Sequence, residues 1–124
     1  GREAEVTGRR PFGPLTVAMK EVENTLIAGR PDRALQLAEQ LPRAVGLTYS
    51  LAVHRHRIDV AKSQVLLGDA DAATATLAEL RSAVPGWLRH QQSAREVAED
   101  IRAARTRMPS AEQRDLADFL RVPM

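Results

Sequence analysis

The sequence is 124 residues long, enough for one domain that buries roughly two thirds of the surface of its unfolded chain. Apolar residues make up 44% and charged residues 27%, a composition that excludes an intrinsically disordered protein. No apolar run approaches the roughly 18 residues of a membrane-spanning helix, and the lack of cysteine excludes disulfides and cysteine metal sites. We therefore expect a cytoplasmic globular domain without a cofactor.

The charge pattern argues against nucleic-acid binding by this chain alone. Eighteen basic and 16 acidic residues give a net charge of +2, and their signs alternate along the sequence. A DNA-binding face typically neutralises about 6–10 phosphates, which needs a block of like charge. The four aromatic residues, Phe12, Tyr49, Trp87 and Phe119, are too few for a platform that stacks single-stranded bases. The chain begins with Gly1 rather than Met, which suggests a piece of a longer protein.

Residues 1–14 have no apolar periodicity, and we interpret them as a linker or disordered arm that precedes a helical domain over 15–124. From Pro14 onward the apolar residues recur at helical spacing and nowhere alternate as in a strand. The pattern predicts an all-α fold of about six helices in three pairs, 15–41, 50–83 and 93–121. The six helices are expected over 15–28, 33–41, 50–67 and 71–83, then after Ser93 and after Ser110.

Several helix starts carry a capping signal. Asp32 and Asp71 precede or open the second and fourth helices, and an aspartate at the N-cap accepts a bond from a free backbone N–H. Ser93 with Glu96, and Ser110 with Gln113, have the spacing of capping boxes. The expected inward stripes of the six helices are Leu15, Met19, Val22 and Leu26; Ala34, Leu35, Ala38 and Leu41; Leu51, His54, Ile58, Ala61 and Val65 with Val53, Val60 and Leu67; Ala73, Leu77 and Leu80; Val97, Ile101, Ala104 and Met108; and Leu116, Phe119 and Leu120.

The first two pairs repeat each other at an offset of 39 residues, so that Gly29 matches Gly68 and Ala34 matches Ala73. Glycine allows the left-handed turn that ends a helix, and a small alanine allows two antiparallel helices to approach closely. A helical hairpin of this kind cannot bury its apolar faces alone, so the pattern predicts stacked hairpins.

The strings LIAGRPDRALQLAEQLP and VLLGDADAATATLAELRSAVP resemble the turn and second helix of tetratricopeptide repeats. The offset of 39 exceeds the usual period of about 34, and the third pair lacks the motif, so we interpret that pair as a cap. Over about residues 15–121 the sequence also resembles the C-terminal half of actinobacterial XRE-type helix-turn-helix regulators. This resemblance implies a tetratricopeptide-like regulatory or dimerisation domain, with DNA contacts made by an N-terminal domain absent from this sequence.

Three further patterns suggest a site, and each has a simpler interpretation. His54 and His56 point about 200° apart on a helix, so they cannot hold one metal ion and are expected to pack or to face solvent. Asp69 and Asp71 lack the remaining ligands of a calcium loop and are interpreted as caps. Residues 110–124 resemble the first half of a helix-turn-helix but are interpreted as a capping helix.

No catalytic constellation is found, so we do not expect an enzyme, and we expect neither a metal site nor a cofactor site. In stacked hairpins the first helices line the concave side, where a protein, peptide or small ligand binds. The candidate groove residues are Glu21, Thr25, Tyr49, Arg57, Gln64, Trp87 and Arg95. The favoured hypothesis is the C-terminal regulatory domain of a helix-turn-helix transcriptional regulator that binds such a partner or forms a homodimer. The alternative is a free-standing helical-repeat adaptor without a DNA role; neither hypothesis involves a membrane.

Overall fold

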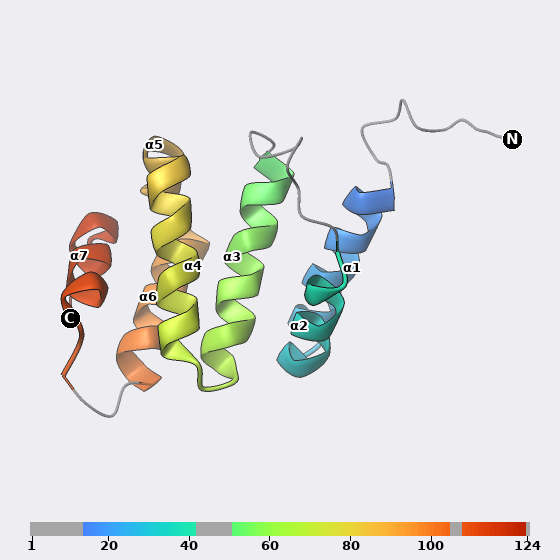
Figure 1. The fold of residues 1–124 in the computed structure, drawn as a ribbon, viewed down its shortest axis with the longest axis horizontal. Coiled ribbons are helices and arrows are strands. Elements are labelled where there is room, and N and C mark those ends of the chain that lie inside the picture. The colour runs from blue at the N-terminus through green and yellow to red at the C-terminus, as the bar shows by residue number, and fades with distance from the viewer. Residues whose placement is uncertain (1–13, 42–50, 105–107, 124) are drawn as a thin grey trace, which may run out of the picture.

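A computed structural model describes residues 14–41, 51–104 and 108–123. Within these ranges the chain forms seven helices and no strand, which confirms the all-α prediction (Figure 1). None of these helices is long and apolar enough to cross a membrane. The helices are α1 (Pro14–Ile27), α2 (Pro31–Glu39), α3 (Leu51–Leu66), α4 (Ala70–Ala83), α5 (Pro85–Leu88), α6 (Gln92–Ala104) and α7 (Ala111–Leu120).

The helices are arranged as hairpins that follow one another along the long axis of the molecule (Figure 1). α1 packs against α2, α3 against α4, and α6 against α7. The first helices of the three pairs are also neighbours, because α3 packs against both α1 and α6. As a result α3 is central, and α1–α2 and α7 form the two ends of the array (Figure 1).

The turns of the first two hairpins have the same geometry. Gly29 and Gly68 have φ angles of +86° and +90°, in the left-handed region that favours glycine. The residue after each glycine donates its backbone N–H to a carbonyl five residues back, Arg30 to Thr25 at 3.1 Å and Asp69 to Gln64 at 2.9 Å. This is the Schellman pattern of helix ends, and it explains why glycine recurs at an offset of 39 residues.

The caps that follow these two turns differ from the prediction at Asp32 and Asp71, whereas the expected cap at Asp69 is confirmed. Arg30, not Asp32, is the N-cap of α2, because Pro31 occupies the first helical position, where its missing N–H costs nothing. Asp69 rather than Asp71 caps α4, and its carboxylate accepts the backbone N–H of Ala72 at 3.1 Å. Asp32 and Asp71 lie in the first turns of their helices, where a negative charge is still favourable.

The capping box at the start of α7 is confirmed. The Ser110 hydroxyl accepts the backbone N–H of Gln113 at 3.1 Å, and the Gln113 side chain accepts the backbone N–H of Ser110 at 3.0 Å. The box expected at Ser93 is wrong, because α6 already begins at Gln92 and Ser93 is its second residue.

The extra helix, α5, is a single turn at Pro85–Leu88, where the sequence predicted only a break. Pro85 takes the first helical position, as at α2, and its fixed φ angle suits a helix start. Leu88 is fully buried and holds this turn against the core. α5 therefore connects the end of α4 to α6 and stays packed against the main body of the domain.

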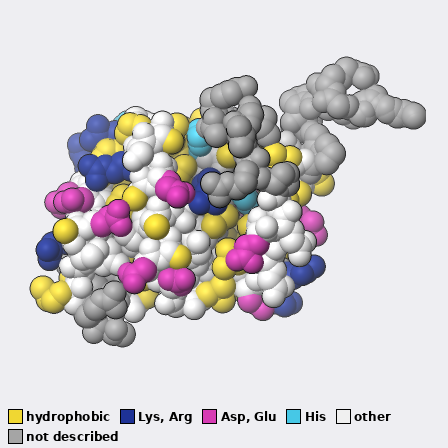
Figure 2. Space-filling view, in the orientation of Figure 1, with side chains coloured by type: hydrophobic (Ala, Val, Ile, Leu, Met, Phe, Trp, Pro, Cys, Tyr) yellow, Lys and Arg dark blue, Asp and Glu magenta, His cyan; other side chains and the backbone are white. Residues whose placement is uncertain are grey.

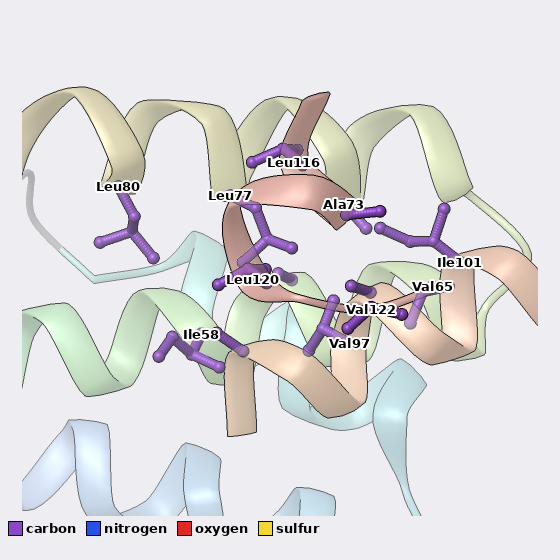
Figure 3. Packing of buried hydrophobic residues seen from close by; sticks show 14 of the residues in the cluster. Ile58, Val65, Ala73, Leu77, Leu80, Val97, Ile101, Leu116, Leu120 and Val122 are labelled. Carbon is purple, nitrogen blue, oxygen red and sulfur yellow. The ribbon is translucent and has the colours of Figure 1, made fainter. Parts of the chain in front are cut away.

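The main core lies among α3, α4, α6 and α7, where side chains from all four helices meet (Figure 3). It contains Ile58, Ala61, Val65, Ala73, Leu77, Leu80, Leu88, Ala94, Val97, Ala98, Ile101, Leu116, Ala117, Leu120 and Val122. Ala73 is fully buried, as the prediction of a close α3–α4 approach requires.

Some predicted core positions face solvent instead. Ala104 and Met108 are exposed, because the stripe of α6 ends with Ile101 and the helix itself ends at Ala104. Leu51 and Leu67 are about half exposed, at the two ends of α3. The first hairpin, α1–α2, buries only Met19, Val22 and Ala34, none of which belongs to the main core.

Candidate functional site

The predicted groove residues do not form one continuous surface. Tyr49 lies outside the described residues. Glu21 and Thr25 lie on α1, where the Thr25 hydroxyl donates to the Glu21 carbonyl at 2.8 Å, a bond within the helix. The remaining four residues separate into two groups, one between α3 and α4 and one around α5.

Arg57 and Gln64 share one face of α3, as their spacing predicts, but this face is turned toward α4. The Arg57 guanidinium pairs with the Glu79 carboxylate of α4 at 3.2 Å. The Gln64 side-chain oxygen accepts a hydrogen bond from the Thr76 hydroxyl of α4 at 2.8 Å. Both side chains therefore join the two helices of one hairpin, and the Arg57 guanidinium already has a carboxylate partner.

Trp87 and Arg95 lie near α5. The Trp87 ring is half-buried against the main core and makes a tilted contact with the His54 ring, with 5.7 Å between centroids. Arg95 donates to the backbone carbonyl of Arg89 at 3.2 Å. Trp87 is thus a packing anchor in part, with one portion of its ring left at the surface.

The first helices carry a second set of charged side chains, exposed or half-buried, which we name the first-helix face. It comprises Lys20 and Glu23 on α1, Arg55, Asp59 and Lys62 on α3, and Asp100 on α6. The three α3 residues follow one another at spacings of four and three, which places them on one side of the helix. This side is the part of α3 that neither the main core nor α4 covers.

Two ion pairs order this face. Lys20 pairs with Glu23 within α1 at 2.9 Å, and both side chains are exposed, so this pair contributes little to stability. Lys62 of α3 pairs with Asp100 of α6, and the two side chains are only 30% and 32% exposed. The second pair therefore fixes how the second hairpin stacks on the third.

Asp59 is the perturbed group of the first-helix face. Burial raises the pKa of its carboxyl to about 6; the negative charge of Glu23 acts in the same direction and the positive charge of Lys20 opposes it. The groups that perturb Asp59 come from α1, so this carboxyl senses the contact between the first hairpin and α3. We did not select Asp59 or Lys62 from the sequence, although both lie on the side of α3 that carries neither of its two predicted apolar stripes.

The two histidines are packing residues, which is one of the two outcomes that we expected from their spacing. His54 and His56 are both buried, and one ring nitrogen of each (His54 Nε2, His56 Nδ1) has no hydrogen-bond partner in the structure. Burial, with a smaller effect of the Arg57 charge, lowers the pKa of His56 to about 4, so this ring is neutral at physiological pH. Within the described ranges no group of three or more His, Cys, Asp or Glu side chains could hold a metal ion.

The sequence matches no protein-family model, and no curated protein or solved structure is detectably similar to it.

Proposed function

We propose that this chain is an interaction domain, and specifically the C-terminal regulatory domain of a helix-turn-helix transcriptional regulator. The observation that carries the proposal is the arrangement of α1, α3 and α6, in which α3 packs against both other helices and all three carry charged side chains that are exposed or half-buried. A face assembled from successive hairpins suits recognition of a protein or peptide, because each hairpin adds contacts along one direction. The assignment to a regulator is supported by the sequence resemblance over about residues 15–121.

The proposal assigns a binding role and no catalytic role to the domain. Four of the six charged groups of the first-helix face are paired with one another, and the two groups with large pKa shifts, His56 and Asp59, are partly or fully buried in helix contacts. Paired charges between helices hold those helices in position. The exposed charges beside them can distinguish one protein partner from another by charge complementarity.

The regulator assignment is tested with the full-length gene product. We expect a helix-turn-helix of roughly 60–80 residues before residue 1, and sequence-specific binding of the full-length protein to DNA upstream of its own gene or its neighbours in a footprinting experiment. A full-length protein without such a domain, or without specific DNA binding, would favour the alternative of a free-standing adaptor.

The role of the first-helix face is tested by a charge reversal. Arg55→Glu changes an exposed side chain in the middle of this face, and Arg33→Glu makes the same change on the exposed side of α2. In a reporter assay of the full-length regulator, we expect Arg55→Glu to abolish regulation and Arg33→Glu to leave it intact, with both variants equally stable. An equal response of both variants would place the interaction surface elsewhere.

A further inference from the structure

Two arginines and one aromatic side chain meet at one corner of the domain, where the ends of α4, α5 and α7 come together. We name Arg81, Arg89 and Phe119 the arginine corner. In Figure 2, lysine and arginine side chains gather in the region that α5 and the adjacent end of α7 occupy in Figure 1. Trp87 and Phe119 are the two described residues among the four aromatic residues of the chain, and both are only partly buried.

The geometry of this corner holds two positive charges on one ring. The guanidinium carbon of Arg81 lies 4.6 Å from the centroid of Phe119, and that of Arg89 lies 5.2 Å from the same centroid. Arg81 comes from the last turn of α4, Arg89 from the end of α5, and Phe119 from the last turn of α7. In the described part of the chain, neither guanidinium forms an ion pair with a carboxylate.

The cation–π contacts leave the corner ready for an anion. A cation–π contact with the ring satisfies none of the N–H groups of a guanidinium, so both arginines keep donors for a ligand. Two like charges near one ring also repel each other, and a bound anion relieves that repulsion. Arg95 adds a third positive group nearby, because it donates to the backbone carbonyl of Arg89.

We propose that the arginine corner binds an acidic segment of a partner protein, with Arg81 and Arg89 holding its carboxylates beside the Phe119 ring. This inference rests on the proposed interaction role and names the chemistry of the partner. It places this contact at the arginine corner and not on the first-helix face. Arginine is among the residues that most often dominate protein–protein binding energies.

The same observations disfavour nucleic acid as the partner. A duplex is typically held by about 6–10 basic contacts, whereas the corner offers two guanidiniums with Arg95 beside them. Asp115 and Asp118, on the same helix as Phe119, are exposed and would repel a long polyanion. A short acidic peptide can avoid these carboxylates, but a phosphate backbone that extends beyond the corner cannot.

The proposal is tested by NMR titration of the domain with blocked hexaglutamate, with blocked hexaglutamine as the uncharged control. We expect saturable shifts of the Arg81 and Arg89 side-chain Nε–H signals, and small shifts of Arg33 on α2. Parallel titrations use inorganic phosphate and a DNA duplex at equal negative charge. Shifts spread evenly over all arginines, or equal effects of phosphate or DNA, would overturn the proposal.

Variants assign the binding to the corner. Arg81→Ala and Arg89→Ala should each weaken hexaglutamate binding about fivefold, the effect of losing one partly exposed charge contact. Arg33→Ala removes the same charge from the exposed side of α2 and should change the affinity less than twofold, about the size of screened long-range effects. Equal effects of all three variants would overturn the proposal. Because this titration uses neither DNA binding nor a reporter, its failure would leave the tests of the regulator assignment unaffected.

Discussion

The first hairpin and the rest of the array have the same turn but very different interiors. The α1–α2 turn and the α3–α4 turn share their φ angle and their pair of backbone hydrogen bonds. The second and third hairpins then close over the main core of 15 buried residues, which includes the large side chains of Ile58, Leu77 and Leu120. The first hairpin contributes none of these and buries only Met19, Val22 and Ala34.

The contact between the first hairpin and α3 also contains ionisable groups. Val53 and Val60 are buried outside the main core, and His56 shares their side of α3 by its spacing. Asp59 lies beside Glu23 and Lys20 of α1, close enough for their charges to shift its pKa. The two hairpins thus share the same glycine turn, but their stability depends on how many apolar side chains each hairpin buries. We expect the first hairpin to open at a lower free energy than the rest.

The largest expected difference concerns apolar truncation. Leu77→Ala removes a fully buried side chain from the main core and should lower the free energy of unfolding by about 3–4 kcal/mol. Val22→Ala, in the first hairpin, should cost only about 1–2 kcal/mol. Urea unfolding measures the loss of unfolding free energy in both variants, and hydrogen exchange shows which helices are destabilised. We expect Val22→Ala to speed exchange in α1 and α2 while protection in α3–α7 stays unchanged; faster exchange throughout would mean that the domain unfolds as one unit.

Overpacking should give the next largest effect. Ala73 is fully buried at the α3–α4 contact, so Ala73→Leu should cost about 1–3 kcal/mol. Ala75→Leu adds the same atoms at an exposed position of α4 and should change the stability by less than about 0.5 kcal/mol. Thermal melts of the two variants test this difference. Equal melting temperatures would show that Ala73 does not lie at a close contact between α3 and α4.

The polar contact of the first hairpin predicts an unusual pH dependence. The pKa of Asp59 is raised to about 6 in the folded state, so the ionised carboxylate opposes folding at pH 7 and stops opposing it as the pH falls toward 4. His56 acts in the opposite direction: its pKa is lowered to about 4, so stability is lost as the pH falls from about 6.5 to 4. The two contributions partly cancel in the native protein.

Asp59→Asn should separate these contributions. At pH 7 the variant should be more stable by about 1 kcal/mol, less than the pKa shift alone implies, because Asp59 is partly exposed and water screens its charge. Below about pH 4 the gain should vanish, since the native carboxyl is then neutral too. Asp115→Asn, at an exposed site on α7, is the control and should have no such dependence. A gain of the same size at both pH values would exclude a titrating Asp59.

The sequence predicted the features that depend on a few neighbouring residues. The Gly29 and Gly68 turns, the capping box at Ser110 and the buried positions Ala73 and Leu77 follow from spacing and side-chain type, and the structure contains all of them. The predicted caps at Asp32 and Ser93 were wrong because α2 begins at Pro31 and α6 begins at Gln92, so each helix starts before its predicted cap.

The candidate site was harder to predict because it depends on which side of α3 each neighbour covers. Spacing correctly placed Arg57 and Gln64 on one face, but only the tertiary arrangement shows that α4 covers it. The arginine corner joins residues that are far apart in sequence, Arg81 and Phe119, through the unpredicted turn α5. No periodicity within one helix carries that information.

The smallest expected effect is also the most direct test of the comparison, because it applies one change to two matching turns. Gly29→Ala and Gly68→Ala each place a Cβ that meets nothing within 4 Å, so the cost is the backbone strain of a left-handed alanine, about 1 kcal/mol in both cases. Gly68→Ala should lower the global free energy of unfolding by that amount. Gly29→Ala should leave the global midpoint nearly unchanged and instead speed hydrogen exchange in α1 and α2 about fivefold, the equivalent of about 1 kcal/mol in a local opening. Equal shifts of the global midpoint would show that the first hairpin unfolds together with the main core, although it contributes no residue to that core.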